Sequence, residues 1–423
     1  MKMKIGIIGG GAAGMAAAIA AAKEGAQVTI IEKNDRVGKK ILATGNGKCN
    51  LSNLAFGTDM YYCSDSEKLK KVFRVFSPWD AVTFFEDAGL MVREKNGYLY
   101  PYSEQASAVL DVLRIQLDKY GVTVLANTEV KSTEYQEQKQ CFAVKTTEGV
   151  LEFDKLILAC GSPASLKKGE GRDGYALAEA FGHKVVPLAP GLCGLRSDES
   201  FTKALAGVRA QAKITLLADG KALAEESGEV QFTDYGISGI PVFQVSRLAA
   251  YACGRGEDVR VKVDFFPEQE PIAYEFMSKL RFETQKEKTL ENYMIGTLNK
   301  KINMVLIKSA GCKPAMTAEE AGFQKVSEIM ALARNFIIHI SEPGYIENAQ
   351  VCAGGVEFSE ISTEMESLFV KGLYFAGEMV DVDGKCGGYN LQWAWTSGYI
   401  AGRNAAGNST EEIANTIEGS EEC

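Results

Sequence analysis

Length, composition and charge already limit what this chain can be. Its 423 residues exceed the roughly 250–300 that one hydrophobic core usually serves, so at least two domains are expected. The formal net charge of −9 argues against nucleic acid or an anionic membrane as the main partner. No apolar run reaches the roughly 18–20 residues of a membrane span, so we expect a cytoplasmic protein.

The cysteines and histidines give no sign of a metal or dithiol site. The ten cysteines are scattered without a C-x-x-C pair, and only two histidines are present, His183 and His339. This spacing does not fit zinc, and it is typical of reduced core thiols in a reducing compartment. We therefore expect no metal, and we expect both histidines to be structural.

The first 32 residues predict a strand, a glycine-rich turn, a helix and a second strand, which together form one βαβ unit. The turn carries Gly9, Gly11 and Gly14 in the G-x-G-x-x-G spacing, and Glu32 closes the second strand. Such glycines permit the tight turn, the approach of backbone to a pyrophosphate and the packing of helix on strand. The helix N-terminus would face the phosphates, and Glu32 would accept hydrogen bonds from an adenosine ribose.

The middle of the first domain is predicted to be helical and then β-rich. A polar, glycine-rich loop over 35–53 precedes it. The periodicity predicts three helices, over 67–76, 79–88 and 103–120, and four strands, over 122–130, 141–147, 150–153 and 155–159. A long polar turn is expected between the first two of these strands.

The pattern changes near Pro187 and Pro190, which predicts an inserted domain. Residues 191–266 favour strands, for example 211–217 and 259–265, and residues 267–335 favour helices with many charges. We place the domain boundaries at 1–190, 191–345 and 346–408, with an acidic, frayed tail over 409–423. The last part of the first domain should contain a strand over 373–376 and a helix over 391–401.

Two further segments favour FAD over NAD as the cofactor. Residues 39–50 contain the run Gly45-Asn46-Gly47, whose glycine-rich backbone suits a second strip of contacts along a long cofactor. Near the C-terminus a strand ends in Gly377-Glu378, and a Gly-Gly turn then opens another helix. That helix N-terminus would stabilise negative charge at the N1/O2 edge of a reduced flavin.

These motifs resemble those of the BaiN-like flavoproteins, a family that includes the bacterial bile-acid Δ4,6-reductase. The resemblance runs over nearly the whole chain, and its most specific runs are Gly-Lys-Cys-Asn at 47–50 and Gly-Gly-Tyr-Asn-Leu-Gln-Trp-Ala-Trp at 387–395. It implies an α/β Rossmann-type FAD-binding domain formed by the N- and C-terminal segments, with an inserted β-barrel-like and helical domain. It also implies reduction of an electron-poor C=C in a hydrophobic, steroid-like substrate.

The motifs and the resemblance together predict which residues contact FAD. They are Gly9, Gly11, Ala12, Ala13, Gly14, Glu32, Lys33, Lys39, Lys40, Gly45, Asn46, Cys49, Asn50, Val130, Ala159, Cys160, Gly161, Gly377, Glu378, Gly388, Asn390 and Leu391.

Two tyrosines are candidate proton donors, and one cysteine is either a reactive thiol or a packed residue. A phenol such as Tyr235 or Tyr389 can supply a proton after hydride transfer, although each is more often a packed residue with a satisfied hydroxyl. Related sequences often carry a histidine in the segment around Tyr235, so proton transfer here can differ from theirs. Cys49 lacks a nearby second cysteine and is expected to pack beside the flavin rather than to react.

Lys39, Lys40, Trp393 and Trp395 also have competing interpretations. The two lysines either meet the pyrophosphate, which we favour, or belong to a solvated loop. The two tryptophans are expected to be core or cofactor-wall residues.

Three classes of function remain open from the sequence. The favoured one is a flavin-dependent reductase in which NAD(P)H reduces FAD, and hydride then passes to the β-carbon of an enone. The chain has no second G-x-G-x-x-G, so the nicotinamide would visit the flavin transiently. The alternatives are a flavin-dependent oxidase or dehydrogenase, and a non-catalytic flavoprotein that binds a partner or RNA. The insert is expected to form one wall of the substrate site, with Tyr235 in it.

Overall fold

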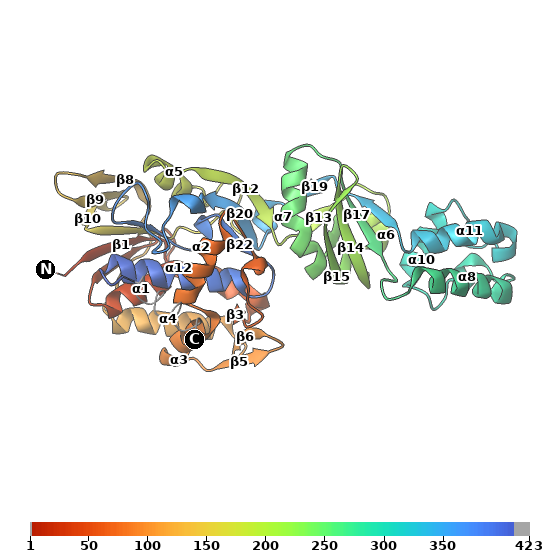
Figure 1. The fold of residues 1–423 in the computed structure, drawn as a ribbon, viewed down its shortest axis with the longest axis horizontal. Helices are drawn as coiled ribbons and strands as arrows, with labels where there is room; N and C mark the ends of the chain where they lie inside the picture. The colour runs from red at the N-terminus through yellow and green to blue at the C-terminus, as the bar shows by residue number, and fades with distance from the viewer. Residues whose placement is uncertain (1, 410–423) are drawn as a thin grey trace. The chain divides into compact units, whose positions relative to one another are not determined.

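The protein is described by a computed structural model that covers residues 2–409, so the predicted acidic tail over 409–423, apart from Ser409, lies outside the described residues. The chain divides into two compact units. Unit 1 comprises residues up to Leu188 and from Val351 onward, and unit 2 comprises Ala189–Gln350. This division differs from the predicted boundaries by only a few residues. Figure 1 shows the elements of both units.

A parallel sheet of five strands forms the centre of unit 1, in the order β21-β11-β1-β2-β7. Its strands are apolar and buried because helices cover both faces of such sheets. The neighbouring strands pair in parallel throughout, with Ile7 opposite Ile157 on one side and Ile30 on the other. The bounds are β1 (Lys4–Ile8), β2 (Gln27–Ile31), β7 (Thr123–Leu125), β11 (Lys155–Leu158) and β21 (Leu373–Phe375).

Two helices from opposite ends of the chain pack side by side in unit 1 (Figure 1). They are α1 (Ala12–Lys23) and α12 (Tyr389–Ala405), and both are rich in small residues. A Cβ placed on Gly398 or Gly402 of α12 would lie only 2.3 or 2.2 Å from a backbone carbonyl oxygen of α1. The absence of side chains at these glycines therefore sets how closely the helices approach.

Further helices and small sheets complete unit 1. The helices are α2 (Ser66–Val75), α3 (Pro78–Asp87), α4 (Ala106–Lys119) and α5 (Asp173–Ala180), with short helices η1 (Lys39–Gly47), η2 (Thr58–Met60), η4 (Phe358–Glu360) and η5 (Gly377–Met379). The strands are β3 (Ser52–Asn53), β4 (Tyr61–Cys63), β5 (Val92–Lys95), β6 (Tyr98–Pro101), β8 (Val130–Gln136), β9 (Cys141–Thr146), β10 (Gly149–Phe153), β20 (Val351–Val356) and β22 (Val382–Gly384). The strand β12 (Val185–Gly191) begins in unit 1, and its last three residues belong to unit 2. Ser77 and Asp80 form the capping box that starts α3.

The prediction of one strand over 122–130 followed by a long polar turn was wrong. The segment splits into β7, which belongs to the parallel sheet, and β8, which pairs antiparallel with β9. Residues 131–136 look like a turn because they are mostly polar, yet they form the partly exposed strand of a hairpin. Pairing with β9 decided the structure of this segment, and local propensity did not.

Unit 2 contains one antiparallel sheet of seven strands, in the order β18-β17-β14-β15-β16-β13-β19. Its edge strands β18 and β19 are separated in the chain by only Ile340 and Ser341, so the sheet curls until its two edges lie together, as expected for a barrel-like domain. The bounds are β13 (Leu195–Arg196), β14 (Arg209–Ala218), β15 (Lys221–Thr233), β16 (Gly236–Ser238), β17 (Val259–Asp264), β18 (Phe336–His339) and β19 (Glu342–Pro343).

The helices of unit 2 lie on the sheet and beyond its end. α7 (Ile240–Gly254) packs along β15, and α6 (Thr202–Leu205) also contacts β15. The predicted helical region contains α8 (Pro271–Gln285), α9 (Leu290–Tyr293), α10 (Lys300–Ser309) and α11 (Ala318–Leu332), and η3 (Ile346–Asn348) follows β19. A second hydrophobic core, separate from that of unit 1, joins the sheet to these helices. Within residues 2–409 no helix is long and apolar enough to cross a membrane.

Candidate cofactor site

The predicted cofactor residues of unit 1 gather at one edge of the parallel sheet. The strands β1, β2, β11 and β21 all run the same way, so their carboxyl ends meet at this edge. From β1 the chain builds outward through β2 and β7, and it then crosses to the opposite side through β11 and β21. The order reverses between β1 and β11, and crevices at such reversal points are where open α/β sheets bind ligands.

The turn after β1 is shaped for a close-approaching phosphate. Gly9 has a φ of 104°, and a Cβ there would lie 2.4 Å from the Ala159 carbonyl oxygen at the end of β11. A Cβ on Gly14 would lie 2.0 Å from the Gly9 carbonyl oxygen, so Gly14 lets the helix pack on the turn. Gly11 differs, because no atom other than those of adjoining residues in the chain lies within 4 Å of its Cβ position. The space over Gly11 is open for a ligand.

The backbone N–H groups in the first turn of α1 are available to bind a ligand. Gly11 is the N-cap residue and makes no side-chain capping bond, and no acidic residue stands in the first turn. The first intrahelical bond runs from the Met15 N–H to the Gly11 carbonyl oxygen, so the N–H groups of Ala12, Ala13 and Gly14 precede the helical ladder. With the positive end of the helix dipole they form a site suited to a pyrophosphate.

Glu32 is buried at the end of β2 and is fixed by three hydrogen bonds. Its Oε2 accepts from the Gly10 N–H at 2.8 Å, and its Oε1 accepts from the Asn34 N–H at 2.8 Å and from Asn34 Nδ2 at 2.6 Å. Oε1 already accepts two hydrogen bonds and Oε2 accepts one, so Oε2 can still accept from a ribose hydroxyl. The sequence reasoning missed Asn34, whose position two residues after Glu32 is the only local signal of its supporting role.

The C-terminal segment meets the same edge through the start of α12. Gly388 is the N-cap residue, with φ of 96° and no side-chain capping bond. The side chain of Asn390 turns back to Gly384, accepting from its N–H at 2.8 Å and donating to its carbonyl oxygen at 2.7 Å. Asn390 therefore offers a ligand its backbone N–H rather than its amide, and the partly buried Leu391 packs on the core. Gly377 touches the start of α1, since its Cβ would lie 2.7 Å from Ala13 Cβ.

The loop that carries the Gly-Lys-Cys-Asn run is tied to α12. Ser52 Oγ donates to Gln392 Oε1 at 2.6 Å, and Trp395 Nε1 donates to the Leu51 carbonyl oxygen at 3.0 Å. Gly45 and Asn46 have left-handed backbone and are exposed. The structure thus brings this loop, α1 and α12 together, which are three segments far apart in the sequence.

Asn50 supplies an independent sign of a missing ligand. Its Oδ1 is buried without a hydrogen-bond partner among the described residues, and a Cβ on Gly388 would lie 2.8 Å from it. Buried polar atoms are normally paired, and an unpaired one needs a partner such as a ligand or water. The open space over Gly11, two uncapped helix starts and this amide oxygen together fit an extended dinucleotide such as FAD. Figure 1 shows α1 and α12, which supply the two starts.

Both lysines predicted to meet the pyrophosphate pair with acidic side chains. Lys39 Nζ lies 2.5 Å from Asp35 Oδ1, and Lys40 Nζ lies 2.7 Å from Glu378 Oε2. Glu378 also accepts from the Cys352 N–H at 2.9 Å, so it links the loop to β20. These contacts favour a positioning role for Lys40 and Glu378.

The other predicted contacts lie near the edge with less distinctive surroundings. Lys33 pairs loosely with Asp173 at 3.6 Å, and Val130 packs partly buried at the start of β8. Ala159 is buried after β11, the Cys160 thiol contacts the Ile8 carbonyl oxygen, and Gly161 has open space at its Cβ position.

Tyr389 and Tyr235 have very different surroundings. Tyr389 is buried, its hydroxyl donates to the Ala55 carbonyl oxygen at 2.7 Å, and burial raises its pKa. These features correspond to the packed alternative and do not favour a proton donor. Tyr235 belongs to unit 2, is 39% exposed, and has no hydrogen-bond partner for its hydroxyl in the described part of the chain. Trp393 and Trp395 are core residues, as expected.

Cys49 should be chemically inert. Its thiol is fully buried, and burial raises its pKa from 9.0 to about 11. At a given pH its thiolate fraction is then about a hundredfold lower than that of an ordinary cysteine. We expect iodoacetamide at neutral pH to label the partly exposed Cys312 long before Cys49, as followed by mass spectrometry of peptides. Early labelling of Cys49 in the folded protein would show that it is a reactive thiol.

His183 is structural and forms a buried chain with two residues that the sequence did not connect. Its Nε2 lies 2.8 Å from Ser367 Oγ, and its Nδ1 lies 3.3 Å from Glu360 Oε2. Ser367 Oγ also accepts from the N–H groups of Phe369 and Val370. The serine is buried and fully engaged, so the arrangement ties three segments together and offers no nucleophile. His339 is exposed beside Asp258.

Burial of His183 should make unit 1 less stable in mild acid. Burial lowers the pKa of its imidazole below 6.5, while Glu360 partly opposes that shift. The unfolded chain then binds a proton that the folded state resists, so stability is full above about pH 6.5 and falls as the pH drops below it. We expect the urea midpoint to fall less between pH 7 and 5 in His183→Gln than in the wild type. His339→Gln is the matched control and should keep the wild-type slope.

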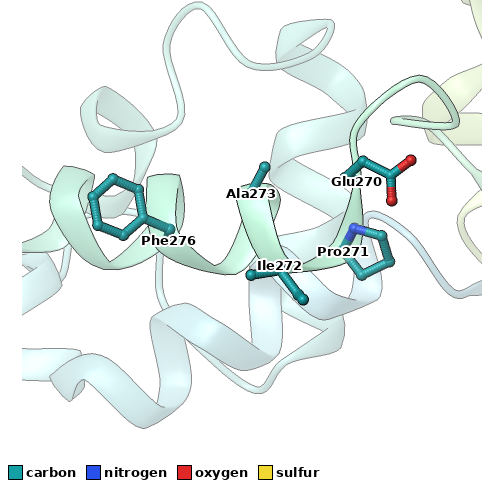
Figure 2. Close-up of a pocket in the computed structure, with 5 residues that line it drawn as sticks. All are labelled: Glu270, Pro271, Ile272, Ala273 and Phe276. Carbon is teal, nitrogen blue, oxygen red and sulfur yellow. The ribbon is translucent and has the colours of Figure 1, made fainter.

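One hollow of unit 2 has little with which to do chemistry. A wide apolar hollow follows the start of α8, and Figure 2 shows its lining side chains, which all belong to one stretch of chain from Glu270 to Phe276. Its one charged group is Glu270. Within residues 2–409 no group of three or more histidine, cysteine, aspartate or glutamate side chains is placed to hold a metal ion.

Comparison with known proteins places this geometry in a family. The model of the HI0933-like protein Rossmann domain matches residues 3–404. A 3-dehydro-bile acid delta(4,6)-reductase from Clostridium scindens is 40% identical over 95% of this chain and 99% of its own. A ribosomal RNA dihydrouridine synthase from Haemophilus influenzae is 31% identical over 93% of this chain and 96% of its own.

Among solved structures, a 3-ketosteroid-Δ4-(5α)-dehydrogenase from Rhodococcus jostii aligns with a TM-score of 0.48 and 15% identity, over 96% of this chain and 97% of that one. The family model and the curated relatives confirm the resemblance drawn from the motifs and the expectation of a Rossmann-type oxidoreductase. The chain belongs to the HI0933-like Rossmann family.

Proposed function

We propose that this chain is an FAD-dependent reductase of carbon–carbon double bonds conjugated to a carbonyl group. The observation that carries the proposal is the cradle at the edge of the parallel sheet, where α1, Glu32 and α12 offer two helix starts and a ribose acceptor. FAD bound there supplies hydride chemistry, with NAD(P)H as the proposed electron donor. The protein's own groups orient the dinucleotide and place positive dipole ends at its phosphates and at its flavin end.

The proposed substrate is a hydrophobic, steroid-like enone. The C. scindens relative, named as a bile-acid reductase, shares 40% identity over almost the whole of both chains, which supports this class. The formal net charge of −9 also favours a small substrate over a polyanion.

A second candidate substrate is a uracil base of ribosomal RNA, because the H. influenzae relative is named as a ribosomal RNA dihydrouridine synthase. The two reactions share their chemistry. Formation of dihydrouridine saturates a C=C whose far carbon is β to a carbonyl, as in an enone. One hydride-donating site is therefore suited to either substrate, and the residues around it select between them.

The direct test of the proposed function measures flavin reoxidation by a substrate in the absence of oxygen. The purified protein is reduced with NADH or NADPH and mixed with a 3-oxo-Δ4,6 steroid acid or with a uridine-containing ribosomal RNA fragment. We expect flavin reoxidation and a product heavier by two hydrogens with the steroid. Saturation of the RNA alone would support the second candidate, and a protein that binds no FAD would exclude both.

Glu32→Ala should weaken FAD binding without abolishing it. The variant loses the ribose acceptor and the bond that fixes Gly10, and charge-assisted hydrogen bonds contribute about 1.5–3 kcal/mol each. We expect the dissociation constant of FAD to rise about tenfold or more, measured by flavin fluorescence. Asp118→Ala, which removes an exposed carboxylate on α4, is the control and should change it little.

A further inference from the structure

Unit 2 contains a cavity of about 220 Å³ that the cofactor site does not use. Its lining residues all belong to unit 2: Leu192, Cys193, Gly194, Arg196, Tyr235, Ser238, Phe243, Gly344, Tyr345, Asn348 and Gln350. Close packing shapes the wall, since a Cβ on Gly194 would lie 2.9 Å from the Tyr235 hydroxyl, and one on Gly344 would lie 2.9 Å from Cys193 Sγ. We call this cavity the Arg196 pocket.

Arg196 lies close to two aromatic rings. Its guanidinium carbon lies 5.7 Å from the ring centroid of Tyr235 and 4.8 Å from that of Tyr345. Its backbone is fixed because β13 pairs with β16 on one side and β19 on the other. Contacts of this kind hold a guanidinium by its face and leave the N–H groups at its edge free to bind.

The charge of Arg196 is only weakly neutralised. The nearest carboxylate is Glu342, whose Oε2 lies 3.8 Å from Arg196 Nε, which is beyond hydrogen-bond distance. Over residues 2–409 no side chain accepts a hydrogen bond from this guanidinium. A half-exposed arginine with five donors and aromatic neighbours is suited to an oxyanion, which it can bind in a bidentate way.

Other polar side chains of the pocket are also free to bind a ligand. The Tyr235 hydroxyl, Ser238 Oγ and the side-chain amides of Asn348 and Gln350 have no hydrogen-bond partner within the described residues. Leu192 and Phe243 add apolar wall. A few polar groups converging in a mostly apolar hollow is the usual character of a small-molecule site.

We propose that the Arg196 pocket binds the oxyanion group of an organic ligand, and that Arg196 makes the pocket select negatively charged ligands over neutral ones. The proposal goes beyond the proposed function and does not depend on it, because the pocket is lined by residues of unit 2 alone. A carboxylate of a steroid acid and a phosphate of a nucleotide share this chemistry, and the test has to tell the two sources apart.

The test compares each acid with its neutral counterpart by isothermal titration of the FAD-loaded protein. The pairs are a 3-oxo-Δ4 steroid acid with its methyl ester, and uridine monophosphate with uridine. We expect one acid to bind roughly tenfold or more tightly than its neutral partner, and Arg196→Gln to remove that preference. Arg196→Lys, which keeps the charge without the planar fork, should keep part of it. Arg209→Gln, at an exposed arginine paired with Glu229, should keep all of it.

The outcomes separate this proposal from the proposed function. A preference for the steroid acid assigns the oxyanion to a carboxylate, and a preference for the nucleotide assigns it to a phosphate. Equal binding of acid and neutral forms, no binding of either acid, or a preference that survives in Arg196→Gln would overturn the proposal. If the preference for the acid depends on Arg196 but neither compound is reduced, the proposal for the pocket is supported and the proposed reaction is wrong.

Discussion

Gly11→Ala should abolish tight FAD binding while leaving the apoprotein folded. Gly11 has an extended backbone, with φ of −78° and ψ of −167°, which alanine adopts without strain. Apart from the adjoining residues of the chain, no protein atom lies within 4 Å of the new methyl group, so it enters the space proposed for the pyrophosphate. The methyl group would displace the pyrophosphate from the first N–H groups of α1. Loss of two charge-assisted hydrogen bonds, at about 1.5–3 kcal/mol each, predicts an affinity for FAD that is about a hundredfold or more weaker.

Gly14→Ala is the informative contrast to Gly11→Ala. Its methyl group would lie 2.0 Å from the Gly9 carbonyl oxygen, so either the turn or the helix must move. We expect both a lower free energy of unfolding and poor FAD binding. In Gly11→Ala only the FAD affinity should change, with the free energy of unfolding of the apoprotein within about 0.5 kcal/mol of the wild type.

Flavin fluorescence titration and urea unfolding of the apoproteins measure the two effects separately. If Gly11→Ala binds FAD as the wild type does, the phosphates do not lie over this turn and the proposed cofactor placement is wrong. Destabilised Gly11→Ala apoprotein would mean that the space over Gly11 is needed by the fold itself.

The elements that the sequence predicted well are those with a strong local signal. The glycine spacing and the apolar runs gave β1, α1 and β2 to within a few residues, and a G-x-G-x-x-G turn has few structural alternatives in that setting. The helix over 391–401 was found but begins two residues earlier, because the Gly-Gly turn ends at its N-cap.

The parts that escaped prediction depend on contacts between distant residues. The polar strand β8 exists because β9 pairs with it, and the Tyr389 hydroxyl is engaged because Ala55 lies opposite. The bond between His183 and Ser367 joins residues 184 positions apart. Arg196 carries no motif at all, and only the pairing of β13 with β19 brings it beside Tyr345. Local patterns contain no information on such pairs.

Gly402→Val should strongly destabilise unit 1, because α1 and α12 approach each other through this glycine. The first side-chain carbon would lie 2.2 Å from the Ala17 carbonyl oxygen, and the α1 backbone cannot yield without disturbing the sheet on which it packs. Overpacking in a close-packed core costs about 1–3 kcal/mol when side chains can adjust, so a clash with backbone should cost at least about 3 kcal/mol.

The matched control for Gly402→Val is Gly254→Ala in α7, where no atom lies within 4 Å of the new methyl group. Alanine is the better helix former by about 0.5–1 kcal/mol, so this variant should be as stable as the wild type or slightly more so. Urea unfolding of both holoproteins measures the difference. A Gly402→Val protein with the wild-type urea midpoint would show that α1 and α12 do not approach each other through this glycine. The proposed FAD site, which depends on the packing of these two helices, would then be wrong.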